Sequence, residues 1–199
     1  LMHEWYDIAS TGERCLLSLV TGFKFQDYYV STLVTQHQHL EENPGFPIAY
    51  LIHQRNNLEA FKLLFKELRQ LCPMTDSEHV TFVSSKHQPI QDAWTQTLPN
   101  SFNMVCWNDL KKSSNILLKK LKITGTHKKN YLKQIDFMLE SKTEEEYLAY
   151  ISECKQGWFD EYTDLFETQL KDTVLRSIRG KLLLQKIFRD ELGNSTKIS

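Results

Sequence analysis

The stretch that most constrains the fold is residues 15–34, CLLSLVTGFKFQDYYVSTLV. Residues 14–21 are almost continuously apolar, which is typical of a strand covered on both faces. Residues 28–35, YYVSTLVT, are rich in aromatic and β-branched side chains, which suit a pleated surface. The two runs predict an antiparallel hairpin, with a turn over residues 22–27.

A third strand is predicted at residues 46–52, FPIAYLI, which follows a polar loop ending in Asn-Pro-Gly. Pro47 stands at its start, where a missing ladder donor is tolerated. The first three strands therefore form an antiparallel meander. Asn57 then provides a cap for a helix whose apolar residues recur at helical spacing until Pro73.

Three further segments complete this half of the chain: a fourth strand at residues 80–84, a short helix at 89–96 and a fifth apolar segment at 103–107. Strands that alternate with helices after a meander predict an α/β domain with helices packed on a mixed sheet. We assign residues 1–107 to this α/β core.

From residue 108 the strong signals are helical, so residues 108–192 are predicted as helices that pack on the core, and residues 193–199 as a frayed tail. Asn108 or Asp109 is the expected cap of the first helix, and Gly125 its expected end. Thr143 opens a capping box for a third helix, and Gly180 is a candidate interruption of the last one.

Charge and composition limit the function. The 199 residues carry 24 basic and 25 acidic side chains, a net charge of -1, so no overall electrostatic attraction draws the chain to nucleic acid or to an anionic membrane. Apolar runs are far shorter than the roughly 20 residues of a membrane span, and no signal peptide is predicted. The four cysteines are widely separated, which indicates reduced thiols in an intracellular protein.

Several segments resemble one family in order and spacing. Residues 20–31, VTGFKFQDYYVS, resemble the opening motif of Mutator-like element (MULE) transposases, where a strand ends in Asp-Thr-Thr-Phe and the next begins with Tyr-Val-Ser. Residues 46–53 and 82–94 resemble the third strand of that family and its fourth strand with the following helix. Residues 106–109, CWND, resemble its Cys-Trp-Asn-His. The resemblance implies an RNase H-like fold with an all-helical insertion.

In that family two Mg²⁺ ions are held by an Asp at the end of the first strand, an Asp after the fourth and a Glu on a late helix. Hard cations need such anionic oxygen ligands to activate water and to stabilise the leaving oxygen of a phosphodiester. In this sequence the first position falls on Val20 and the second on Ser85. The third has no assigned position, and Asp109 stands where the family has His. We therefore expect no catalysis, no bound metal and no cofactor.

Two groups of acids lie near these positions. Residues 75–78, TDSE, precede the fourth strand and are expected at its opposite end, several residues at about 3.3 Å each from Ser85. Asp27 lies across the predicted hairpin turn from Val20. We interpret both as acids of surface turns.

The helical half offers two candidate binding surfaces. Its first part is rich in lysine, and candidates for phosphate contacts are Lys111, Lys112, Lys119, Lys120, Lys128 and Lys129. Residues 136–172 are acidic and rich in aromatic side chains. Most of these are expected in the core, and any left exposed would anchor a protein partner; the candidates are Trp158, Phe159, Tyr162 and Phe166.

We predict a transposase-derived domain that has lost its chemistry and serves as a protein-interaction or scaffold module in a nuclear, chromatin- or DNA-associated assembly. A protein partner is expected, a membrane is not, and a homodimer is left open. One alternative is sequence-tolerant DNA or RNA binding through residues 111–133. Another is an active metal-dependent nuclease with relocated acids.

Overall fold

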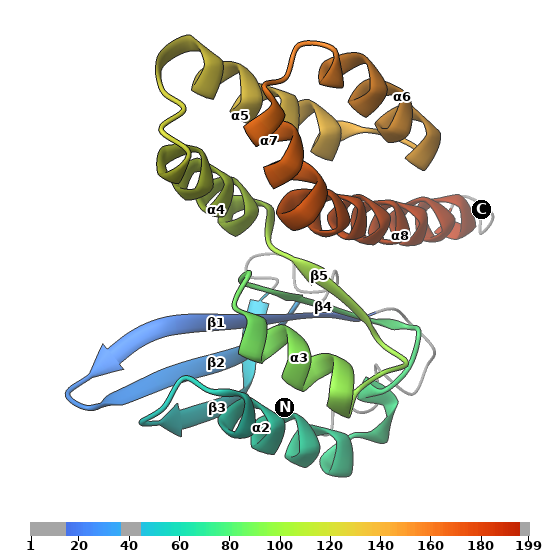
Figure 1. The fold of residues 1–199 in the computed structure, drawn as a ribbon. Helices are drawn as coiled ribbons and strands as arrows, with labels where there is room; N and C mark the ends of the chain where they lie inside the picture. The colour runs from blue at the N-terminus through green and yellow to red at the C-terminus, as the bar shows by residue number, and fades with distance from the viewer. Residues whose placement is uncertain (1–14, 37–44, 196–199) are drawn as a thin grey trace. The chain divides into compact units, whose positions relative to one another are not determined.

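The computed structural model describes residues 15–36 and 45–195 (Figure 1). The chain divides into two compact units, Leu1–Met104 and Val105–Ser199. The expected boundary, between residues 107 and 108, lies just after this division. Within the described residues, no helix combines the length and the apolar character needed to span a membrane.

The first unit contains a sheet of the order β3-β2-β1-β4-β5 (Figure 1). Its strands are β1 (Cys15–Phe25), β2 (Tyr28–Gln36), β3 (Gly45–His53), β4 (Val80–Ser84) and β5 (Phe102–Val105). The first three form an antiparallel meander, and β4 pairs parallel to β1. The predicted α/β class with a mixed sheet is therefore confirmed.

The hairpin between β1 and β2 is longer than predicted. The expected turn over residues 22–27 is wrong, because β1 runs to Phe25, which pairs with Tyr28, and only Gln26 and Asp27 form the turn. The register shifts between Val20 and Phe23, where Gly22 has a φ of 112°. A bulge at a glycine with positive φ lets the strand continue, where the sequence indicated a turn.

Two helices cover one face of the sheet: α2 (Leu58–Leu71) and α3 (Gln88–Thr97), which lie side by side (Figure 1). The predicted cap of α2 is confirmed, since Asn57 Oδ1 accepts a hydrogen bond from Ala60 N at 3.1 Å. The short 3-10 helix Pro73–Thr75 follows directly after α2, as expected from Pro73.

The core of the first unit centres on Phe82 of β4. The ring of Trp94 stacks on it with centroids 3.8 Å apart, and Phe65 of α2 meets both rings edge-on. All three side chains are buried, together with Leu17 of β1 and Leu33 of β2. Stacked and edge-to-face aromatic pairs stabilise a core beyond the area they bury, so this cluster fixes α2 and α3 on the sheet.

We expect Trp94→Ala to lower the free energy of opening of the first unit by about 3–5 kcal/mol, because it removes a buried indole and leaves a cavity. The measurement is native-state hydrogen exchange of β1 and β4 peptides, which separates this unit from the helical one. Leu63→Ala, at an exposed position of α2, is the control and should change the value by about 0.5 kcal/mol or less. Equal effects of both variants would contradict the assignment of this core.

The second unit is helical. Its elements are α4 (Trp107–Lys120), α5 (Gly125–Glu140), α6 (Glu144–Lys155), α7 (Asp160–Leu165), a π-helical turn at Phe166–Leu170, and α8 (Lys171–Ser195). The predicted capping box is confirmed: Thr143 Oγ1 accepts from Glu146 N at 3.1 Å, and Glu146 Oε2 accepts from Lys142 N at 2.6 Å.

Three expected helix boundaries are wrong. α4 begins at Trp107, before the expected caps Asn108 and Asp109, and Gly125 opens α5 where it was expected to end α4. Gly180 is buried inside α8 without interrupting it. Packing has outweighed the cost of about 1 kcal/mol for glycine in a helix. α8 also continues to Ser195, beyond the expected start of the tail at 193, and residues 196–199 lie outside the described residues.

Candidate interaction surface

The positions expected to hold metal ligands lie level with one another on neighbouring strands. In the parallel pair, Leu17 of β1 is opposite Phe82 of β4, and Ser18 is opposite Val83. Continuing this register by two residues places Val20 beside Ser85. On its other side Val20 pairs with Thr32, and its own side chain is 58% exposed. This strand end therefore presents an alkyl group and neutral hydroxyls.

The residues after β4 add no carboxylate. Gln91 Nε2 donates to Ser84 Oγ at 2.5 Å and to Ser85 O at 3.1 Å. Burial lowers the pKa of Lys86 and the pKa of His87, so both side chains are shifted toward their neutral forms. Within the described parts of the chain, no group of three or more His, Cys, Asp or Glu residues is placed to hold a metal ion.

The nearby acids serve other purposes. The carboxylate of Asp76 forms an ion pair with Arg69 at 2.9 Å and accepts a hydrogen bond from Asn100 N at 2.9 Å, which ties α2 to the segment before β5. Asp27 lies in the hairpin turn beyond Phe25. At about 3.3 Å per residue, Phe25 alone is roughly 16 Å along the strand from Val20. Neither acid can replace a carboxylate at position 20.

A serine and a histidine meet on the inner side of the meander. Ser31 Oγ lies 3.1 Å from His53 Nε2, and His53 Nδ1 lies 2.8 Å from Arg55 O. Such a pair can activate a hydroxyl nucleophile only where a substrate reaches it. Ser31 is 1% exposed beneath α2, so this contact satisfies buried polar groups and links β2 to β3.

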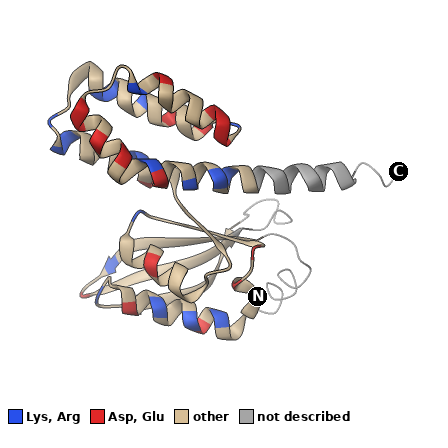
Figure 2. Ribbon diagram, turned by 45° about the vertical axis from the view of Figure 1, so that its right-hand side comes forward, with Lys and Arg blue, Asp and Glu red and all other residues tan. Residues whose placement is uncertain are grey.

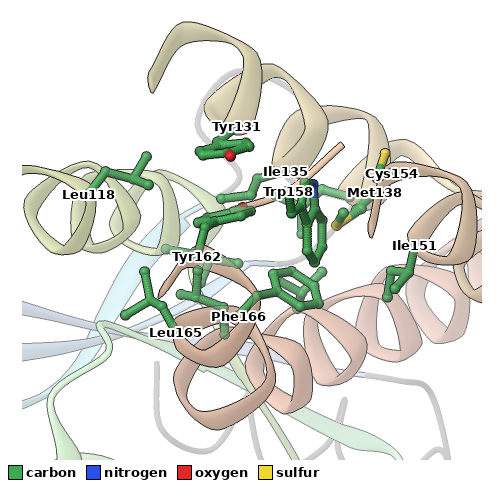
Figure 3. Packing of buried hydrophobic residues seen from close by; sticks show 14 of the residues in the cluster. Leu118, Tyr131, Ile135, Met138, Ile151, Cys154, Trp158, Tyr162, Leu165 and Phe166 are labelled. Atoms are coloured by element: carbon green, nitrogen blue, oxygen red, sulfur yellow. The ribbon is translucent and has the colours of Figure 1, made fainter. Parts of the chain in front are cut away.

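Three of the four expected aromatic anchors are wrong. Trp158, Tyr162 and Phe166 are buried in the core of the helical unit, where Figure 3 shows them turned toward one another. Tyr162 stacks on Tyr131 with ring centroids 3.8 Å apart, and Trp158 Nε1 donates to Gln134 Oε1 at 2.8 Å. Aromatic side chains at helical spacing fill this core, which leaves them no surface to offer a partner.

Phe159 is the exception among the four. It is exposed and rests with its ring 4.8 Å from that of His127. It precedes α7, whose remaining apolar side chains Tyr162 and Leu165 face the core. One exposed ring of this kind is common on protein surfaces and does not define an interface.

The candidate lysines fall into two groups. Lys111 and Lys112 of α4 form ion pairs with Asp136 at 2.6 Å and with Asp109 at 3.7 Å. Lys119 and Lys120 end α4, and Lys128 and Lys129 lie near the start of α5; among the described residues, these four form no ion pair. Figure 2 shows basic and acidic residues together on these helices. The second group is therefore the better candidate for phosphate contacts.

We expect Lys119→Gln with Lys120→Gln to weaken binding of nucleic acid more than Lys111→Gln with Lys112→Gln. The reason is that the carboxylates of Asp136 and Asp109 already neutralise Lys111 and Lys112. Fluorescence anisotropy with single-stranded and duplex DNA over a salt series measures this. Removal of one lysine that binds a phosphate should reduce the slope of log affinity against log salt by about 0.7–0.9. Equal effects of the two double variants would contradict the division into two groups.

The sequence did not predict an exposed apolar surface on the outer face of the meander. It consists of side chains that are between 43% and 67% exposed on the outer face of the meander: Val20, Phe23, Phe25, Tyr28, Tyr50 and Ile52. We call this set the apolar sheet face. Soluble proteins rarely expose so many large apolar groups together without a binding role.

Strand register shows that these side chains adjoin. Across the three strands, Val20, Thr32 and Tyr50 form one row, and Phe23, Val30 and Ile52 form the next. Phe25 and Tyr28 close the hairpin beyond them. Opposed side chains on one face are about 4.5–5.5 Å apart at Cβ, so the three rows make one continuous surface. No charged residue belongs to any row.

The alternate residues of the same strands point the other way. Leu17, Leu19 and Leu33 pack into the core with α2, and the ring of His53 lies 5.4 Å from that of Phe61. Lys24 also belongs to this side, since its Nζ lies 5.5 Å from the centre of the Tyr29 ring. Figure 2 accordingly shows strands β1 to β3 without charged residues except near the hairpin tip.

The apolar sheet face was missed because residues 22–27 were interpreted as a turn. The signal that could have found it is the period of two in Phe23, Lys24 and Phe25, which continues as a strand if Gly22 forms a bulge. The near-continuous apolar character of residues 14–21 also predicts a strand covered on both faces. That prediction is wrong, because alternate residues of β1 are buried and Val20 is exposed.

Comparisons with known proteins return no match: no family model fits the chain, and no curated protein matches its sequence. The resemblance to Mutator-like element transposases therefore stays a prediction.

Proposed function

We propose that this chain is a transposase-derived, RNase H-like domain without catalytic activity, which acts as a protein-interaction or scaffold module in a nuclear assembly. The observation that carries the interaction role is the apolar sheet face: six large apolar side chains, three of them from β1, exposed side by side with no charge among them. Surfaces of this kind bind proteins, because burying them removes apolar area from water.

The arrangement of the sheet supports the RNase H-like part of the proposal. The sheet has an antiparallel three-strand meander, followed by further strands with flanking helices, which is the arrangement predicted together with the RNase H-like fold. A helical region then follows β5, where the family has its insertion. Fold alone does not determine function, so the proposed loss of activity rests on the chemistry of the strand ends.

The chemistry of the strand ends supports the loss of activity. Two Mg²⁺ ions about 4 Å apart require several anionic oxygens around them. Val20 offers no lone pair, Ser85 offers a neutral hydroxyl, and Asp76 is held by Arg69. The next residue, Lys86, has no oxygen in its side chain and cannot supply an anionic ligand either.

We expect the unmodified protein to show no Mn²⁺-dependent rise in melting temperature and no hydrolysis of single-stranded or duplex DNA. Val20→Asp with Ser85→Asp should create a Mn²⁺-dependent rise, because the two carboxylates would lie on neighbouring strands about 4.8 Å apart. Leu63→Asp with Leu71→Asp, at exposed positions of α2, adds the same charge elsewhere and should show no rise. Mn²⁺-dependent cleavage by the unmodified protein would contradict the proposal.

The interaction role predicts a set of bound proteins that depends on the apolar sheet face. We expect the tagged chain to retain partners from nuclear extract that Phe23→Glu loses, because a buried, unpaired carboxylate is costly at an interface. Leu63→Glu is the matched control and should retain them, since it charges an exposed apolar position on α2. Quantitative mass spectrometry compares the three samples. If the unmodified chain and both variants retained the same proteins, the apolar sheet face would not be the binding surface.

A second candidate is nucleic-acid binding through Lys119, Lys120, Lys128 and Lys129, favoured by their lack of ion pairs within the described chain. These side chains surround the connection between α4 and α5. Acids on α6 and α7 limit this surface, since Glu145, Glu161 and Asp164 are exposed in the same unit. The lysine variants described above test this candidate.

A further inference from the structure

We propose that the apolar sheet face binds the same face of a second copy of this chain, giving a two-fold symmetric dimer in which two meanders stack face to face. This inference rests on the proposed interaction role and names its partner.

The exposed area agrees with a dimer of ordinary size. The six side chains include four aromatic rings and are between 43% and 67% exposed. With about 150–250 Å² for each aromatic side chain, they offer about 700 Å² of apolar surface. Two copies would then bury about 1,400 Å², which lies inside the range of about 1,200–2,000 Å² for stable, specific interfaces.

The charge pattern agrees with self-association. In a two-fold dimer the same patch meets itself, so any charge near the axis would face a like charge. The rows Val20–Thr32–Tyr50 and Phe23–Val30–Ile52 contain none. Lys24 is directed to the other side of the sheet, over Tyr29. Two copies of the apolar sheet face can therefore pack against each other without electrostatic repulsion.

The β3 edge of the sheet is a poorer route to a dimer than the face. β3 lies at the end of the strand order, but Pro47 has no backbone N–H, and the register with β2 shifts between Leu33 and Val34. Proline and bulges are features that discourage pairing of edge strands. Stacking of two sheets about 10 Å apart needs no edge hydrogen bonds and buries the rows of side chains directly.

Exposed aromatic rings on a sheet can also stack on nucleic-acid bases, but such platforms work together with cations that follow the phosphate backbone. The rows of this face hold no lysine or arginine. An apolar partner surface matches the face better than a polyanion.

Sedimentation velocity of the full chain over a range of concentrations tests the proposal. We expect a monomer–dimer equilibrium, with Phe23→Glu raising the dimer dissociation constant by about 30-fold or more, as for a residue at the centre of an interface. Leu63→Glu, which adds the same charge on α2, should leave the constant unchanged. Circular dichroism and melting of each variant establish that it is folded.

Two variants of opposite charge show whether a lost dimer reflects the interface or a loss of folding. Phe23→Glu with Ile52→Glu and Phe23→Lys with Ile52→Lys each charge one row of the face. Each protein should be monomeric alone, and a mixture of the two should form a heterodimer, because opposite charges then meet. A mixture that stays monomeric at concentrations where the unmodified chain is dimeric would overturn face-to-face stacking.

Different results would contradict the dimer and the proposed interaction role. A chain that is monomeric at every concentration, or a dimer that Phe23→Glu does not weaken, overturns the second copy as occupant. If that monomer still retains nuclear proteins through Phe23, the interaction role stands with a different partner. If neither dimer nor retained proteins depend on Phe23, both proposals fall.

Discussion

The structure of the first unit depends on a packing constraint: α2 and α3 cover only one face of the meander. The stacked rings of Phe82 and Trp94, with Phe65 against both, hold the helices on that face. Because side chains alternate along a strand, burying Leu17, Leu19 and Leu33 under the helices turns their neighbours to the opposite side. The exposed rows follow from this alternation and from the apolar residues that the sequence places in it.

Much of this fold could be predicted from local signals. The caps Asn57 and Thr143 mark real helix starts, because their side chains accept backbone hydrogen bonds that the helix itself leaves unpaired. The meander and the following alternation of strands and helices were also predicted. Local signals failed where glycine was involved: Gly22 forms a bulge, Gly125 opens a helix and Gly180 lies inside one. Glycine permits several backbone conformations, so tertiary packing selects among them.

The candidate surfaces were harder to predict, because exposure is a property of packing. Trp158, Tyr162 and Phe166 have the residue types of interface anchors, yet they fill the centre of the helical unit around Tyr131 and Ile135. Phe23 and Phe25 have the same chemistry and are exposed, since neither α2 nor α3, the helices described in their own unit, covers that side of the hairpin. The sequence alone does not distinguish these two situations. For the strands, the register in the structure distinguishes them, because it shows which side chains share the exposed face.

Under the proposed function, the place of Val20 links the loss of a metal site to the gain of a binding surface. It stands level with Ser85, where the proposed ancestor would have held a cation, and it belongs to the first row of the apolar sheet face, beside Thr32 and Tyr50. An aspartate there would introduce an ionised group among Phe23, Tyr50 and Ile52, with a heavy cost of desolvation in any complex that covers them. Under the proposed function, reversion to a nuclease would thus disrupt the apolar sheet face. If the face is the proposed interface, selection that preserves it would oppose the return of an aspartate at position 20.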